Sequence, residues 1–218
     1  MRNNNYMAKI IYKNVVALSP HTDDIEFGCG GTLARLIEEG ANIYPVVFSK
    51  CEKSVPQGFP NDVLIKEMHT SYDHLNILPQ NRILFDYPVR EFPKFRQEIL
   101  EDMVKINKEL EPDLILTPSS FDVHQDHKII NNESIRAFRF STLLGYELPW
   151  NNLEFKNQLV IELKKKHIEK KVDCINSYNS QKFRQYSDSK LFFDESIVRG
   201  IQNKRARAEI FEVIKMYF

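Results

Sequence analysis

The fold of this chain is decided by residues 15–32, Val15-Val16-Ala17-Leu18-Ser19-Pro20-His21-Thr22-Asp23-Asp24-Ile25-Glu26-Phe27-Gly28-Cys29-Gly30-Gly31-Thr32. An apolar run ends at Leu18, and after Thr32 the apolar side chains recur at helical spacing. This order is typical of a buried strand, a loop and a helix. Open α/β sheets bind their ligands at such junctions, so a histidine and two adjacent carboxylates placed there indicate a functional site.

Strands and helices alternate along most of the remaining chain. We predict strands at residues 10–18, 43–48, 82–85, 113–117 and 159–163, and helices at about residues 29–39, 62–75, 92–110, 128–140, 164–178 and 205–217. Residues 145–152 are typical of a loop, and a polar link is expected around residues 187–189.

The alternation predicts an α/β fold in which a mostly parallel sheet lies between helices, in three layers. A chain of 218 residues suits one such domain. We therefore expect residues 1–218 to form a single domain, with residues 1–142 as its regular α/β core and residues 143–218 as a less regular C-terminal part.

The composition limits the kinds of partner. With 30 basic and 30 acidic residues the formal net charge is zero, which favours a small-molecule substrate over nucleic acid. Three widely spaced cysteines fit neither a disulfide framework nor a zinc knuckle and indicate a reducing compartment. The N-terminus lacks the apolar core of a signal peptide, and nowhere do ~18 apolar residues follow one another. We expect a cytoplasmic protein without a membrane span.

A second loop of similar character follows the strand predicted at residues 113–117. Its sequence is Pro118-Ser119-Ser120-Phe121-Asp122-Val123-His124-Gln125-Asp126-His127, and a helical pattern comes after it. The carboxyl ends of parallel strands lie at one edge of a sheet, so the two loops can meet although they are about a hundred residues apart. We expect one site built from both.

The residue types in the first loop suit a catalytic metal site. Zinc accepts histidine nitrogen and carboxylate oxygen, and its catalytic sites use three protein ligands. A tight turn can bring His21 and Asp24 to one ion and leave Asp23 between them free. Asp23 can then act as general base toward water, while the metal polarises the carbonyl under attack. This arrangement predicts amide hydrolysis.

The second loop supplies the remaining groups. One of its two histidines, His124 or His127, completes the coordination, and the other is free to stabilise an oxyanion, as a protonated imidazole, or to protonate the departing amine. Asp126 is placed to orient a histidine from outside the coordination sphere.

The two loops together resemble the LmbE/PIG-L family of metal-dependent de-N-acetylases. The resemblance rests on Pro20-His21-Thr22-Asp23-Asp24, on Gly28-Cys29-Gly30-Gly31-Thr32 and on His124-Gln125-Asp126-His127. It implies a Rossmann-like fold and the removal of an acetyl group from an N-acetylglucosamine-type sugar in a glycoconjugate, glycolipid or nucleotide-sugar precursor. The implied cofactor is Zn²⁺, with another divalent metal as the alternative.

The resemblance also assigns roles. It implies that His21, Asp24 and His127 bind the metal, that Asp23 is the base, and that His124 assists the oxyanion or the leaving group. Two positions depart from the family. Thr22 stands where members most often have proline, which affects the stiffness of the loop more than its chemistry. Members also often carry an arginine three residues before a glutamate on the predicted helix at residues 62–75, whereas here Leu64 precedes Glu67.

Several of these interpretations have alternatives. His21-Thr22-Asp23-Asp24 alone is also typical of a capped helix start. The glycine-rich segment at residues 28–31 lacks a P-loop lysine, which favours close helix–strand packing over a phosphate cradle. Tyr146 and Trp150 are candidates for stacking on a sugar ring, with core packing or a contact in a homo-oligomer as the alternative.

Two other functions remain open. One is a metal-dependent amidohydrolase that acts on a non-sugar amide, since the motif chemistry permits it. The other is a metal-containing sugar-binding protein without turnover. Asp23 and His124 argue against the second, because binding alone needs neither.

Overall fold

The structure, a computed structural model that describes residues 12–217, contains one seven-stranded sheet in the order β3-β2-β1-β4-β5-β7-β6. The strands are β1 (Asn14–Ser19), β2 (Asn42–Val47), β3 (Ile83–Leu84), β4 (Leu114–Pro118), β5 (Thr142–Tyr146), β6 (Leu159–Glu162) and β7 (Ala208–Lys215). The strands from β3 to β5 are parallel, and β7 runs antiparallel to β5 and β6.

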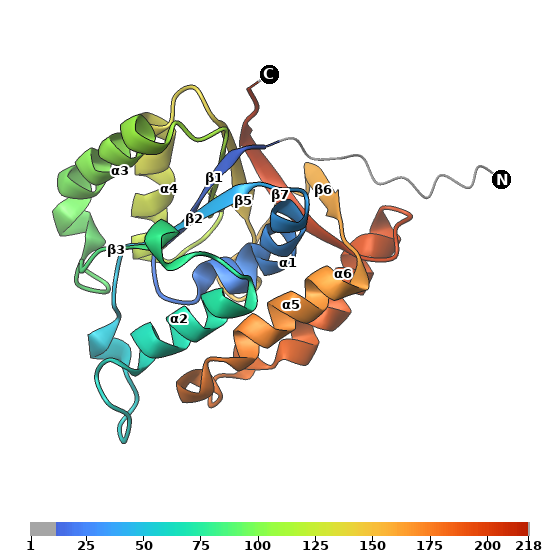
Figure 1. Ribbon diagram of the computed structural model, residues 1–218, viewed down its shortest axis with the longest axis horizontal. Coiled ribbons are helices and arrows are strands. Elements are labelled where there is room, and N and C mark those ends of the chain that lie inside the picture. Colours follow the sequence, from blue (N-terminus) through green and yellow to red (C-terminus); the bar gives the residue numbers. More distant parts are fainter. Residues whose placement is uncertain (1–11, 218) are drawn as a thin grey trace.

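Helices cover both faces of the sheet. They are α1 (Asp24–Glu38), α2 (Val63–His74), α3 (Arg96–Leu110), α4 (Gln125–Ala137), α5 (Lys165–Asn176) and α6 (Ser189–Gln202). In Figure 1, α3 and α4 lie on one face and the other four helices on the opposite face. Side chains of β1 alternate accordingly: Val15 and Ala17 join one apolar core, and Val16 and Leu18 join the other. The predicted three-layered α/β fold is confirmed.

Most predicted elements are present with shifted ends. The first strand begins at Asn14, and residues 10 and 11 of the predicted strand lie outside the described residues. The first helix begins at Asp24 rather than at residue 29, but it is kinked at Cys29, whose φ of −146° is not helical. The helical spacing that starts after the glycines therefore marks only the second half of α1.

The C-terminal part differs most from the prediction. The helix predicted at residues 205–217 is wrong, because residues 208–215 form β7 between β5 and β6. The loop predicted at residues 145–152 begins with the end of β5, a wholly buried strand. The polar link around residues 187–189 leads directly into α6, which the sequence pattern did not indicate.

The glycines of α1 allow its close packing. A Cβ on Gly28 would lie 2.2 Å from Cδ2 of Tyr146, and a Cβ on Gly31 would lie 2.8 Å from Leu163. At the kink, the Glu209 carboxylate of β7 accepts hydrogen bonds from the backbone N–H groups of Gly31 and Thr32, at 3.1 and 2.7 Å. Glu209 thus caps the second half of α1 from another element.

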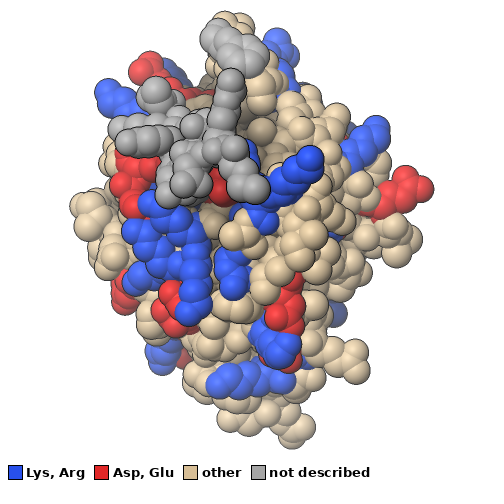
Figure 2. Space-filling model, turned by 90° about the vertical axis from the view of Figure 1, so that its right-hand side faces the viewer, with Lys and Arg blue, Asp and Glu red and all other residues tan. Residues whose placement is uncertain are grey.

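Charges of both signs are distributed over the surface, and Figure 2 shows basic side chains interspersed with acidic ones on one face. The lysine run at the start of α5 is paired: Lys164 and Lys166 both contact Glu38 of α1. All three cysteines are buried and free. Within residues 12–217, no helix has both the length and the apolar composition needed to cross a membrane.

The sheet order creates a crevice at one place. From β1 the chain proceeds outward to β2 and β3 and then returns to β4 on the other side of β1. The loops after β1 and β4 therefore diverge from neighbouring strands at a topological switch point, where open α/β sheets bind ligands.

Candidate active site

Three side-chain atoms from the two loops converge at the switch point. His21 Nδ1 lies 3.1 Å from His127 Nε2, and Asp24 Oδ2 lies 3.2 Å from the first and 3.4 Å from the second. The tight turn after β1 holds Asp24 in place, because its Oδ2 also accepts the backbone N–H of His21 at 2.7 Å. The structure thus brings together the two halves that the sequence placed a hundred residues apart.

This donor set fits a divalent cation of the zinc type. Bonds of 2.0–2.2 Å in tetrahedral geometry separate two ligand atoms by about 3.3 Å, which matches the observed triangle. Although burial opposes both shifts, His127 and His21 hold the pKa of Asp24 well below its usual range, and Asp24 and Asp122 raise the pKa of His127 to about 10. The surroundings therefore favour positive charge at this point.

Two carboxylates outside the triangle orient its imidazoles. The wholly buried Asp122 lies 2.7 Å from His127 Nδ1, and Asp126 lies 3.1 Å from His21 Nε2. Each carboxylate accepts a hydrogen bond from the ring nitrogen that points away from the triangle. The other nitrogen of each ring therefore faces the triangle. Asp126 was expected in this position; Asp122 was missed, although it directly precedes Val123 and His124 in the motif.

His124 lies beside the triangle and belongs to a three-histidine group, with His21 and His127, that can hold a metal ion. Its Nδ1 accepts the backbone N–H of Asp126 at 3.2 Å, as the N-cap of α4. The neutral ring then carries its proton on Nε2 and cannot ligate through that nitrogen. Burial, together with His127 and His21, lowers the pKa of His124 to about 4. The low pKa argues against the protonated imidazole that the sequence led us to expect and favours a neutral ring at His124.

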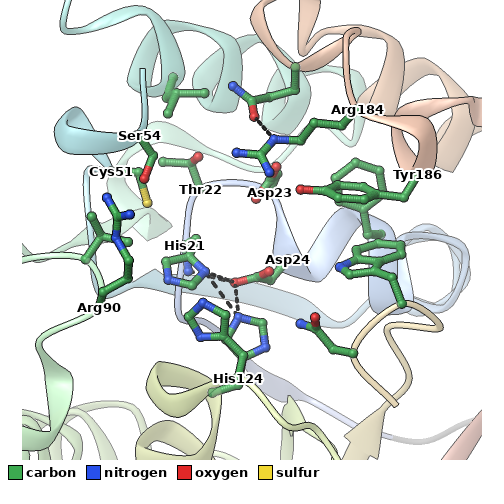
Figure 3. Close-up of a pocket in the computed structure, with 17 residues that line it drawn as sticks. His21, Thr22, Asp23, Asp24, Cys51, Ser54, Arg90, His124, Arg184 and Tyr186 are labelled. Atoms are coloured by element: carbon green, nitrogen blue, oxygen red, sulfur yellow. Dashed lines mark hydrogen bonds and ion pairs between the residues drawn. The ribbon is translucent and has the colours of Figure 1, made fainter. Parts of the chain in front are cut away.

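Asp23 is the N-cap residue of α1, but its side chain makes no capping hydrogen bond. The alternative of a simple capped helix start is therefore not supported for Asp23. Its carboxylate lines the cavity, with Arg184 and Tyr186 beside it (Figure 3). Burial and the adjacent Asp24 raise the pKa of Asp23 to about 6, against the opposing charges of His21 and Arg184. A carboxylate with this pKa suits a general base near neutral pH.

The cavity around these groups has a volume of about 340 Å³. Trp150 lines it as expected and stacks on Tyr186 with ring centroids 4.2 Å apart. Tyr146 does not reach it: this side chain is 1% exposed and its hydroxyl donates to the Leu18 carbonyl at 2.9 Å. The expected sugar contact of Tyr146 is thus replaced by core packing, the alternative stated for it.

A buried network behind the first loop was not predicted. The Tyr178 hydroxyl lies 2.5 Å from the Thr22 carbonyl oxygen and 2.7 Å from Glu26 Oε1, which also accepts from Ser71 Oγ at 2.6 Å. Burial raises the pKa of Glu26 to about 8. A protonated Glu26 can donate to the Tyr178 oxygen, so the Tyr178 proton is free to fix the Thr22 carbonyl next to Asp23.

Comparison with known proteins gives a consistent family. The family model described as PIG-L, GlcNAc-PI de-N-acetylase, matches residues 16–138. The chain is also 31% identical over 175 residues to the uncharacterized deacetylase YaiS of Escherichia coli strain K12, covering 77% of this chain and 91% of YaiS.

Solved structures share the fold at lower identity. The N,N'-diacetylchitobiose deacetylase of Pyrococcus horikoshii superposes with a TM-score of 0.77 at 18% identity, over 93% of this chain and 84% of that one. GalB, the 4-carboxy-2-hydroxymuconate hydratase of Pseudomonas putida KT2440, also gives 0.77, at 16% identity, over 94% and 98%. The same fold thus carries different reactions, and the side chains of the site must identify the reaction.

Proposed function

The chain belongs to the PIG-L family of GlcNAc-PI de-N-acetylases and is a deacetylase, and from this premise we propose that it uses zinc to remove the acetyl group from an N-acetylglucosamine-type sugar. The sugar belongs to a glycoconjugate, a glycolipid or a nucleotide-sugar precursor. The observation that carries the proposal is the triangle of His21 Nδ1, Asp24 Oδ2 and His127 Nε2, with Asp23 beside it in the cavity.

We assign His21, Asp24 and His127 as the residues that hold the metal. We leave His124 out of this set because its Nδ1 already accepts the backbone N–H of Asp126, which favours a proton on Nε2. Asp122 and Asp126 keep the two ligand imidazoles in their binding tautomers. When bound, zinc supplies Lewis-acid polarisation of the acetyl carbonyl.

The remaining steps use side chains of this chain. Asp23 takes a proton from the attacking water and then holds it within reach of the departing amine. The Nε2–H of His124 donates a hydrogen bond to the oxygen that becomes negative in the tetrahedral intermediate. The stacked pair of Trp150 and Tyr186 provides an apolar wall against which a sugar ring packs.

The C-terminal part is proposed to belong to the same domain as the rest. Residues 208–215 lie inside the sheet, and Glu209 caps α1, which begins at the active site. A boundary at residue 142 would cut through the cores on both faces.

The experiment is the release of acetate from N-acetylglucosamine conjugates, measured with and without a chelator and after adding back zinc. We expect activity that is lost on complete metal removal and restored by the metal. Acetylated peptides and N-acetyl amino acids serve as non-sugar amides: preferential cleavage of these would identify an amidohydrolase of another substrate class. Binding of metal and sugar without turnover would identify the non-catalytic alternative.

A further inference from the structure

Two arginine side chains line the active-site cavity and have no part in the chemistry described above. They are Arg90, in the segment between β3 and α3, and Arg184, in the segment between α5 and α6. Figure 3 places them on opposite sides of the cavity, with His21 and Asp24 between them. The cavity therefore carries positive charge at two separate places on its wall.

Arg184 is fixed and already faces a carboxylate. Its Nε donates to Gln181 Oε1 at 2.7 Å, and the neighbouring Ser180 is held by the buried Glu67 through hydrogen bonds of 2.8 and 2.6 Å. The far end of the guanidinium points toward Asp23 in Figure 3, and its charge lowers the pKa of that carboxyl. The charge of Arg184 is therefore balanced within the protein.

Arg90 is tied to the same site through its backbone. Its N–H donates to Asp126 Oδ2 at 2.6 Å, and this oxygen also lies 3.1 Å from His21 Nε2. The residue has a φ of +70°, a left-handed conformation that is uncommon for a residue with a Cβ. Asp126 thus holds the Cα of Arg90 at a fixed place relative to the metal-binding histidines.

The charge of Arg90, by contrast, is not balanced. Within residues 12–217 its guanidinium forms no hydrogen bond or ion pair, although its neighbour Glu91 pairs with Lys53 and Lys94. The hydroxyl of Ser54 lies on the same side of the cavity (Figure 3). The acidic residues of the cavity are Asp23, which faces Arg184, and Asp24, which contacts His21 and His127.

We propose that Arg90, with Ser54 beside it, is the specificity determinant for an anionic group on the substrate, so that the acetylated amino sugar carries a carboxylate or a phosphate. Guanidinium binds both anions in a bidentate manner, and a hydroxyl adds one donor. Arg90 is exposed, so water solvates its guanidinium when no anion is bound, and a neutral sugar offers it no charged partner. The inference rests on the proposed function and adds the charge of the substrate to it.

The test compares kcat/KM for acetate release from N-acetylglucosamine with that for its 1-phosphate, its 6-phosphate and its 3-O-lactyl ether. At least one charged sugar is expected to exceed the neutral one by about tenfold to a hundredfold, mainly through a lower KM, because a charge-assisted hydrogen bond contributes this much. The preferred compound distinguishes phosphate from carboxylate. High salt is expected to reduce the advantage.

Variants of Arg90 distinguish a loss of anion recognition from a general loss of activity or folding. Arg90→Gln is expected to abolish the advantage of the charged sugar and to leave kcat/KM for N-acetylglucosamine within about twofold. Arg90→Lys keeps the positive charge but loses the paired N–H donors of the guanidinium. It is expected to retain part of the higher kcat/KM for the charged sugar. Lys108→Gln, on the exposed face of α3 away from the cavity, removes the same charge and is the matched control. Thermal unfolding confirms that each variant is folded.

Two results overturn the inference while the proposed function stands: equal kcat/KM for neutral and charged sugars in the wild-type protein, or equal loss for both in Arg90→Gln. If none of the four compounds releases acetate and non-sugar amides do, the proposed function itself fails.

Discussion

Asp23 and Asp24 are adjacent carboxylates with different surroundings. Asp24 is 6% exposed and contacts two imidazoles, which hold its pKa well below the usual range. Asp23 makes no capping hydrogen bond and has a pKa raised to about 6. One is thus held as a permanent anion, whereas the other can accept and return a proton near neutral pH. Such a division of environments assigns acid–base roles.

Asp23→Asn is therefore expected to lower kcat by about 10²–10⁴-fold, the usual contribution of a general base. The variant keeps the ligand triangle, so its zinc content, measured by elemental analysis after dialysis, is expected to equal that of the wild type. The matched variant Asp24→Asn is expected to lose zinc. Equal zinc loss in both variants contradicts the division of roles.

His124 distinguishes two possible ligand sets, because three histidines lie close enough to share an ion. The hydrogen bond from Asp126 N–H to its Nδ1 places the proton on Nε2 and favours a donor role. We expect His124→Ala to lower kcat by about 10²–10³-fold, the cost of removing an oxyanion donor, while zinc content stays unchanged. His127→Ala is the comparison and is expected to lose the metal. A zinc-free His124→Ala protein would instead indicate a three-histidine site.

At the scale of elements, the sequence predicted the parts of the fold that depend on local pattern. The first four strands are marked by short apolar runs, and the loops after β1 and β4 are marked by histidines and carboxylates. Because parallel strands end at one edge, this pattern also predicted the meeting of His21 with His127. The ligand triangle could therefore be predicted from the sequence.

In the C-terminal part, β6 and α5 were predicted, whereas β7 was not, because tertiary contacts determine it. In β7 both Glu209 and Glu212 are buried on opposite faces, where Glu209 caps α1 and Glu212 accepts from the backbone N–H of Ser120 at 2.8 Å. Charged residues two or three apart among apolar ones are equally typical of an amphipathic helix. Glu26 was missed because its partners, Ser71 and Tyr178, are distant in sequence, whereas Asp122 lies only five residues before its partner His127.

Glu209 links three elements and should be sensitive to substitution. It caps the kink of α1 and lies 2.7 Å from Nζ of Lys171 in α5, with both side chains buried. Glu209→Gln leaves the lysine charge buried without its partner and is expected to destabilise the fold by about 3 kcal/mol. The measurement is urea unfolding, with Glu154→Gln, on an exposed residue, as control. A loss as small as that of the control would mean that the cap is dispensable.

The raised pKa of Glu195 in α6 makes the stability of the fold depend on pH. Burial raises its pKa, although Lys171 and Arg199 oppose the shift. The folded state therefore binds this proton more tightly than the unfolded state. The resulting destabilisation is complete above the folded pKa and disappears as the pH falls toward the unfolded value of about 4.3.

Glu195→Gln is accordingly expected to raise the free energy of unfolding relative to wild type more at pH 8 than at pH 5. Urea unfolding at the two pH values measures this difference, again with Glu154→Gln as control. A larger gain in the free energy of unfolding at pH 5 than at pH 8 would contradict the conclusion that burial raises the pKa of Glu195.

At the scale of the whole molecule, the metal ligands join segments that the sheet brings together but the chain keeps apart. His21 and Asp24 precede α1, whereas His127 follows β4 and lies in α4, on the opposite face of the sheet. A bound ion therefore connects the two helical layers across the switch point. Because the unfolded chain does not present this triangle, binding adds to the stability of the whole fold.

Zinc is therefore expected to raise the midpoint of thermal unfolding, by an amount that corresponds to about 2.7 kcal/mol when its free concentration is a hundred times Kd. Magnesium, which prefers oxygen ligands, is expected to have little effect at the same concentration. Asp23→Asn should retain the zinc-dependent shift, whereas His21→Ala should lose it, because only the second variant breaks the triangle. A shift of equal size in His21→Ala would place the stabilising zinc elsewhere on the molecule and separate stability from the active site.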